Sequence, residues 1–188
     1  MVLAFLCHTV VSTPCRVLYS AVFGDDLQQA FIVVKNGAQN DTLRSVRKDQ
    51  LMQVACRVQA EFGFRLACRD SDGSESVLAD KGFLRSSPGD PFLTSKAVVW
   101  HVADSCAYVM ICELDENRLQ AESILALLVR LIQVHVVAGE QRTVEILLKG
   151  DKVATILHQF LPSGHILFLN SKVVAQYEKQ LEKLIAGK

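Results

Sequence analysis

The sequence predicts an α+β fold, in which a five-stranded antiparallel sheet carries helices on both faces and a further helix follows at the C-terminus. Apolar segments of strand length come in pairs joined by short turns, which is typical of β-hairpins. Longer segments in which apolar residues recur every three or four positions indicate amphipathic helices. At 188 residues, one domain spanning 1–188 is expected, because strands grouped as hairpins form an antiparallel sheet against which the helices pack.

Two hairpins supply most of the predicted strands. The first joins Val2–Val11 to Arg16–Phe23 through a short turn that contains Pro14. The second turns at Asp104-Ser105, a two-residue connection. The other predicted strands are Lys96–Ala103 and Cys106–Leu114, which flank this turn, and the shorter Gly82–Arg85. We expect polar surface loops at 25–42 and 68–81, the second rich in Ser, Gly and acidic residues.

Four helices are predicted by the apolar period. They are Leu43–Phe62, closed by Gly63; Leu119–Ala138; Thr143–Leu161, stopped by Pro162 and Gly164; and a C-terminal helix at about 171–186 beyond a core of about 1–162. The third is predicted as one continuous helix in which Gly150 is tolerated at about 1 kcal/mol. Asp115-Glu116-Asn117 is interpreted as the N-cap and first turn of the second, where acidic groups complement the helix dipole.

The helix Leu119–Ala138 is apolar around most of its circumference and should therefore be buried on more than one side. A chain of this length has a small core, so we expect a partner protein to cover part of the helix. The candidate residues for this interface or for the core are Leu125, Leu128, Val129, Ile132 and Val136.

Charge and cysteine content narrow the function classes. Lys+Arg and Asp+Glu are equal in number and no basic patch stands out, which argues against nucleic acid and against autonomous binding to anionic lipid. The six cysteines form no C-x-x-C pair, so reduced, packed thiols in the cytosol are expected. No basic residue precedes the apolar N-terminal run, which argues against a signal peptide. No stretch reaches the roughly 18 apolar residues of a membrane span.

Catalytic motifs do not emerge from the sequence. G-x-S-x-G, H-E-x-x-H and Walker-type loops are lacking, and the five histidines lie far apart, each beside apolar residues. Arg16 after Cys15 is a weak hint of a lowered thiol pKa, whereas a strand position favours a packed thiol. We therefore predict no enzymatic activity, no metal and no cofactor. A cysteine-dependent hydrolase, the alternative from another class, would need Cys, His and an acid converging on a cleft.

Several stretches of sequence resemble longin-domain (profilin-like) proteins, and among them the sigma, or small, subunits of adaptor complexes. CAYVMICELDENRLQAESILALLVRL is similar to their strand, acidic-Asn turn and long helix. VEILLKGDKVATILHQFLPSG is similar to their next helix, except at Gly150-Asp151 and Pro162. The closer resemblance is to the sigma subunits of the fifth adaptor protein complex. It rests on MVLAFLCHT, CRVLYS, VRKDQ, AVVW, DENRLQAE and ILHQFLPSGHILFLN, which together span most of the chain.

This resemblance implies a structural subunit of a heterotetrameric membrane coat that acts in vesicle trafficking, endosomal transport and protein sorting. Its implied partners are two large subunits, of zeta and beta type, and a medium (mu) subunit, with spatacsin and spastizin as associated proteins. The implied location is cytoplasmic, peripheral on the cytosolic face of late endosomes and lysosomes, with membrane contact only through the complex. No nucleic acid is implied.

In clathrin-linked relatives the sigma subunit helps to bind acidic dileucine signals. By resemblance, Arg16 corresponds to the arginine that meets the acidic position, and Val129 and Ile146 correspond to walls of the leucine pocket. Ala138 falls where a polar residue is usual. The alternative, which we favour, is that Arg16 is a solvated charge at a strand end and that the two aliphatic residues belong to the core.

Another longin protein remains the main alternative within binding modules. A SNARE regulatory domain would require a heptad coiled coil and a tail anchor, and the sequence up to Lys188 has neither pattern. A subunit of a vesicle tethering complex is compatible with everything in the sequence.

Overall fold

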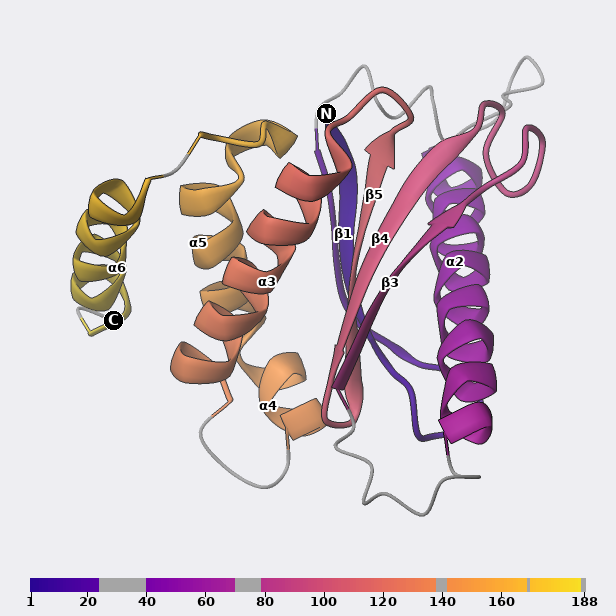
Figure 1. Ribbon diagram of the computed structural model, residues 1–188, viewed down its shortest axis with the longest axis horizontal. Coiled ribbons are helices and arrows are strands. Elements are labelled where there is room, and N and C mark those ends of the chain that lie inside the picture. Colours follow the sequence, from indigo (N-terminus) through magenta and orange to yellow (C-terminus); the bar gives the residue numbers. More distant parts are fainter. Residues whose placement is uncertain (24–39, 70–78, 138–141, 169, 187–188) are drawn as a thin grey trace.

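The computed structural model describes residues 1–23, 40–69, 79–137, 142–168 and 170–186 (Figure 1). The strands are β1 (Val2–Thr9), β2 (Val17–Val22), β3 (Ala79–Arg85), β4 (Lys96–Ala103) and β5 (Cys106–Glu113). The helices are α2 (Asn40–Arg69), α3 (Arg118–His135), α4 (Arg142–Leu148), α5 (Gly150–Phe160), the 3₁₀ turn η2 (Pro162–Gly164) and α6 (Ser171–Ala186). The predicted α+β class, with helices on both faces of a five-stranded sheet, is confirmed (Figure 1).

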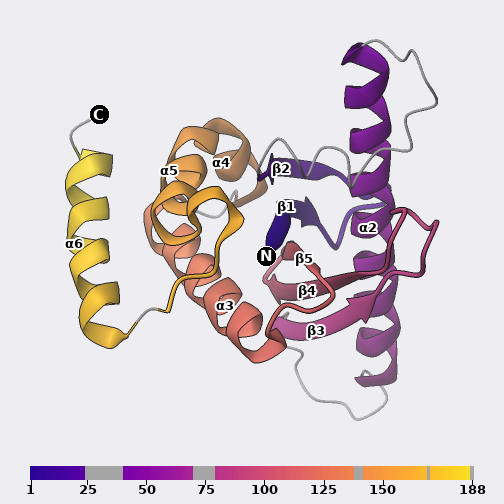
Figure 2. The same cartoon turned by 90° about the horizontal axis from the view of Figure 1, so that it is seen from above.

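The sheet has the order β2-β1-β5-β4-β3, and every neighbouring pair is antiparallel. Both predicted hairpins are present, and Asp104 takes the positive φ of 59° that a two-residue hairpin turn requires. Every residue of β1 is buried because its two faces look into two separate cores. α2 covers one core, whereas α3 and α5 cover the other (Figure 2).

The helix α2 is longer than predicted, because it starts at Asn40 and runs through Gly63 to Arg69. Residues 40–42 and 68–69, which were predicted as loop, are therefore helical, while 79–81 begin β3. The remaining parts of both predicted loops lie outside the described residues. The helix continues past Gly63 because Leu66 prolongs the stripe that begins with Leu51 and includes Phe62, all against the same core.

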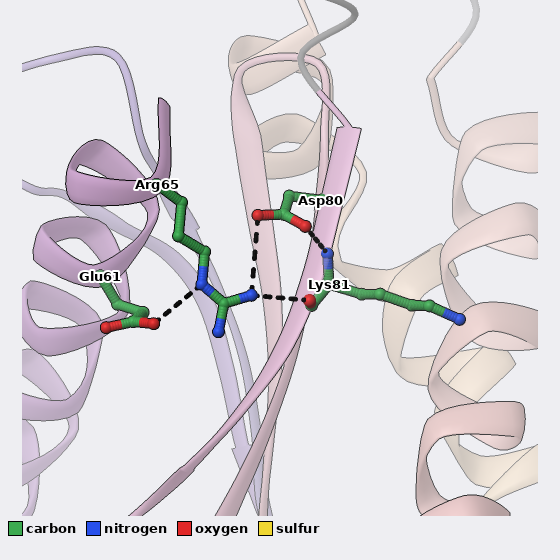
Figure 3. Close-up of polar contacts among 4 residues, drawn as sticks. All are labelled: Glu61, Arg65, Asp80 and Lys81. Atoms are coloured by element: carbon green, nitrogen blue, oxygen red, sulfur yellow. Dashed lines mark hydrogen bonds and ion pairs between the residues drawn. The ribbon is translucent and has the colours of Figure 1, made fainter. Parts of the chain in front are cut away.

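Arg65 fastens the end of α2 to β3 (Figure 3). Its Nε donates to Glu61 Oε1 at 2.8 Å, and its Nη1 donates to the carbonyl oxygen of Lys81 at 3.2 Å. The same Nη1 lies 3.8 Å from Asp80 Oδ2, and the guanidinium carbon lies 5.0 Å from the ring centroid of Trp100. These contacts stabilise the part of α2 that continues beyond Gly63.

The predicted continuous helix Thr143–Leu161 is wrong, since the chain breaks at Lys149 into α4 and α5. Lys149 has φ −110° and ψ 32°, outside helical values. Its Nζ donates to the carbonyl oxygen of Val136 at 2.9 Å and pairs with Glu145 at 2.9 Å. At Gly150 a Cβ would lie 3.6 Å from the Tyr19 ring, an ordinary van der Waals contact, so the bend passes beside β2 without requiring glycine for space.

The five residues of α3 that the sequence offers for an interface or for the core lie in the core, while Leu119 and Val134 of the same helix are 74 and 66% exposed. Leu125, Leu128, Val129, Ile132 and Val136 are all between 0 and 2% exposed within this chain. The sheet covers one side of α3 through β4 and β5, and α5 covers another. The five residues therefore belong to the core.

The helix α6 closes this side of the molecule (Figure 2). Leu181 is fully buried, and the ring of Tyr177 stands edge-on to Phe160, with centroids 5.8 Å apart. Arg130 of α3 forms an ion pair with Glu178 of α6. The chain's own C-terminal helix thus forms the layer outside α3 and α5.

The cap of α3 also differs in detail from the prediction. Asn117 is the N-cap, and its Oδ1 accepts from the backbone N–H of Gln120 at 3.2 Å. Asp115 and Glu116 precede the cap, and the first turn holds no acidic residue. Glu116 instead forms an ion pair with the amino group of Met1, which ties the start of β1 to this turn.

Candidate functional site

Two of the three residues assigned to a cargo pocket lie in the core. Val129 on α3 is 2% exposed and Ile146 on α4 is 1% exposed, and both belong to the same apolar cluster. Arg16 is exposed at the entry to β2, where its backbone N–H donates to Thr9 Oγ1 at 3.1 Å. In this conformation the two aliphatic side chains present no surface to a leucine. The fourth position, Ala138, lies outside the described residues.

The short helix α4 turns an apolar face outward. Val144, Leu147 and Leu148 are 42, 57 and 77% exposed. Ile146 holds the helix against the core, and α4 packs beside β2. The sequence predicts Val144 and Leu148 in one continuous helix with the residues of α5, but the break at Lys149 separates them into two helices. Exposed apolar side chains grouped in this way are typical of a protein-binding surface.

A groove of about 730 Å³ opens between β2 and the first half of α2. Five of the six residues of β2 line one wall, and residues between 44 and 52 line the other. Three of the latter carry positive charge: Arg44, Arg47 and Lys48. Sequence analysis missed this groove, because it depends on how far α2 extends along the sheet.

Cys15 and His8 come together at the closed end of the β1–β2 hairpin. Cys15 Sγ lies 3.4 Å from His8 Nδ1, and that nitrogen is also 3.0 Å from the carbonyl oxygen of Thr9. Burial raises the pKa of Cys15 to about 11, so the group stays a neutral thiol despite the neighbouring Arg16. His8 Nε2 is buried and has no hydrogen-bond partner within the described part of the chain, whereas a catalytic imidazole would be oriented by an acid there. The pair therefore fits packing better than nucleophilic catalysis.

The part of the chain that the structure describes contains no cluster of three or more His, Cys, Asp or Glu side chains able to hold a metal ion.

His8 makes the stability of the fold depend on pH. Burial lowers the pKa of His8 in the folded chain below its usual value, which is about 6.5. As the pH falls through about 6.5, the unfolded chain binds a proton that the folded chain does not, so stability is lost. We expect the melting temperature to fall between pH 7.5 and 5.5, and to fall less in His8→Gln.

Two further variants separate this effect from others. Burial also lowers the pKa of His101, so His101→Gln should reduce the remaining slope. His158→Gln, at an exposed position, serves as the control. Parallel curves for wild type and His8→Gln would contradict the assignment.

Comparison with known proteins decides the family. The family profile described as "AP-5 complex subunit sigma-1" matches residues 1–182. The chain belongs to this AP-5 sigma-1 family. A curated relative from Homo sapiens, "AP-5 complex subunit sigma-1", is 35% identical, and the match covers 96% of each chain. A protein of the same name from Mus musculus is 33% identical over 72% of this chain and 88% of its own.

Membership of the AP-5 sigma-1 family confirms the resemblance found in the sequence. It makes the chain a small subunit of an adaptor complex, a non-enzymatic class, and so favours this assignment over a tethering subunit or a hydrolase. Within the described residues, no helix is long and apolar enough to cross a membrane. For an AP-5 sigma-1 protein, the surfaces that matter are those that other subunits of the complex can reach.

Proposed function

We propose that this AP-5 sigma-1 family member is a structural subunit of a heterotetrameric coat in endosomal and lysosomal protein transport. Its partners are two large subunits of zeta and beta type and a medium (mu) subunit. It works at the cytosolic face of late endosomes and lysosomes and reaches the membrane only through the complex. Family membership over residues 1–182 supports this proposal. Spatacsin and spastizin are proposed as further partners of the assembled complex.

The outward face of α4 is the surface that we propose for contact with a large subunit. Its three exposed apolar side chains are on one short helix whose inner side is held by Ile146. Covering Leu147 and Leu148 would remove apolar surface from water at about 25 cal/mol per Å². The core face of α3, by contrast, is already filled by the chain itself.

Co-purification tests this proposal. The tagged chain is co-expressed with both large subunits and the medium subunit, and the recovered subunits are quantified. We expect all three to be recovered with the wild type and recovery to fall at least about tenfold for Leu147→Asp, because the new charge would have to be desolvated at an interface core. Leu184→Asp on α6 is a matched control, since Leu184 is 54% and Leu147 is 57% exposed.

The outcomes separate the general role from the specific surface. If the wild type recovers none of the three subunits, the proposed function fails. If the wild type assembles but Leu147→Asp and Leu184→Asp behave alike, the α4 surface is wrong while the function stands. Circular dichroism of both variants shows whether they remain folded.

Cargo binding by Arg16, Val129 and Ile146 is a separate question. We expect an acidic dileucine peptide titrated against the assembled complex to show no saturable binding that depends on Arg16, because both aliphatic side chains are buried. Arg16 alone would contribute only about 0–1 kcal/mol as a surface ion pair. Saturable binding that Arg16→Ala weakens would overturn this expectation, and it would mean that α4 moves to open the core.

A further inference from the structure

We propose that the outer edge of β2, beneath the first turns of α2, accepts an extended acidic segment of another protein as an additional strand. This surface lies on the α2 side of the sheet and does not use the core residues Val129 and Ile146. The proposal does not depend on which coat the subunit serves. It rests on three features of the described residues: a free strand edge, an overhanging helix and a local excess of positive charge.

The free edge belongs to β2, the outermost strand on its side of the sheet. Among the described residues, β2 pairs only with β1. The backbone N–H of Phe23 donates to the carbonyl oxygen of Leu3 at 3.0 Å, and Ala21 is paired with Phe5. Hydrogen-bonding directions alternate along an antiparallel strand, so the main-chain groups of Ser20 and Val22 point away from β1. Such an edge is ready to bind another strand.

The helix α2 extends past this edge. Figure 2 shows the first turns of α2 beyond the last strand, whereas its later turns lie across the sheet. From Leu51 onward the helix has apolar residues in the core, but residues 44–46, 48 and 49 are exposed. The overhang and the strand edge together form the two walls of the 730 Å³ groove. A strand added at the usual spacing of about 4.8 Å would lie in this corner.

The positive charge on the first turns of α2 indicates what kind of segment would bind in the groove. Arg44, Arg47 and Lys48 line the groove, and its described lining residues include no carboxylate. Among the described residues, Arg47 Nε has no hydrogen-bond partner, so the donors of this guanidinium are not all used within the chain's described part. An extended segment with acidic side chains would satisfy both the main-chain edge and these cations.

Other occupants fit these features less well. A second copy of the chain, paired β2 to β2, would bring two sets of Arg44, Arg47 and Lys48 together and repel. A nucleic acid would use the cations but leave the main-chain groups of Ser20 and Val22 without partners. We therefore choose a protein strand.

The test uses the full chain and a peptide of four Glu-Val repeats as the probe. Hydrogen exchange and fluorescence anisotropy are measured with this peptide, with a Lys-Val peptide of equal length and with an octamer of glutamate. We expect saturable binding of the Glu-Val peptide and slower exchange at the amides of Ser20 and Val22. The Lys-Val peptide should not bind, and the glutamate octamer should leave both amides unprotected.

Two variants test the proposed binding site, and each has a matched control. Ser20→Pro removes an N–H that the sheet itself does not use, which an edge strand tolerates, and it should weaken binding at least about tenfold. Ser20→Thr keeps the N–H and should bind like the wild type. Arg44→Glu/Lys48→Glu should weaken binding to a similar degree. Lys172→Glu/Lys179→Glu on α6 makes the same change of net charge and should not.

Three results would overturn the proposal. The first is no binding of the Glu-Val peptide to the wild-type chain. The second is binding that Ser20→Pro leaves unchanged, which would mean attraction of charge without strand pairing. The third is equal loss in the α2 and α6 charge variants, which would mean a general effect of net charge. Circular dichroism and melting of each variant establish that the sheet is intact before binding is compared.

Discussion

Gly164→Ala is expected to lower the free energy of unfolding by about 2–6 kcal/mol. Gly164 has a φ of +79°, which side chains other than glycine rarely adopt. Its position is also enclosed, because an added Cβ would overlap the carbonyl oxygen of Val2 and lie 2.8 Å from Phe23 Cβ. A backbone oxygen in β1 cannot move aside without disturbing the sheet, so both penalties apply.

The same substitution at two other glycines separates these penalties. Gly89 also has a positive φ, +82°, but a Cβ there would meet nothing within 4 Å, so Gly89→Ala should show the backbone penalty alone. Gly63 is helical and open, and Gly63→Ala should raise stability by about 0.4–1 kcal/mol. Urea unfolding of the three variants gives the comparison. Equal effects at Gly164 and Gly89 would mean that the contact with Val2 is unimportant.

Leu157→Ala is expected to cost about 2–5 kcal/mol of folding free energy. Leu157 is 2% exposed and lies in the core shared by the sheet, α3 and α5. Removing its methyl groups leaves a cavity between layers that are fixed by other contacts and cannot fully collapse. Thermal and urea unfolding measure the loss, which should also reduce the amount of folded protein in cells.

Leu148→Ala is the matched control for this prediction. The residue is 77% exposed on α4, so the same substitution should change stability by less than about 0.5 kcal/mol. If Leu157→Ala melts like the wild type, the inner face of α5 has been assigned wrongly. If Leu148→Ala is as destabilised as Leu157→Ala, α4 is packed more tightly than its exposure indicates.

Local sequence patterns predict those parts of the fold that depend on residues close together in the chain. The turn Asp104-Ser105 predicts the β4–β5 hairpin because a two-residue connection leaves adjacent strands no other arrangement. The spacing of Val153, Ile156 and Phe160 predicts the buried face of α5, because residues three and four positions apart lie on the same side of a helix. The short stretches that resemble the adaptor family, such as DENRLQAE, are also local, and they indicated the family that the comparisons established.

The candidate surfaces could not be predicted in this way. The apolar residues of α3 are interpreted as too many for the chain to cover, but the sheet and α5 bury the five candidate residues between Leu125 and Val136. The apolar residues of α4 are predicted in one continuous helix with α5, but Val144, Leu147 and Leu148 face outward on a separate helix, because Lys149 leaves the helical conformation. Burial depends on what else packs nearby, and the period of one segment does not contain that information.

The sequence by itself determined the fold class, the hairpins, the inner face of α5 and the adaptor family. Only the tertiary structure decided that the core of α3 is closed, that Val129 and Ile146 are inside it, and that α2 extends past the edge of β2. Hydrophobic periodicity indicates which face of a helix or strand becomes buried, because that face is defined by residues a few positions apart. Which surface supplies the cover depends on the pairing of β1 with β5 and the docking of α6, contacts between residues far apart in the chain.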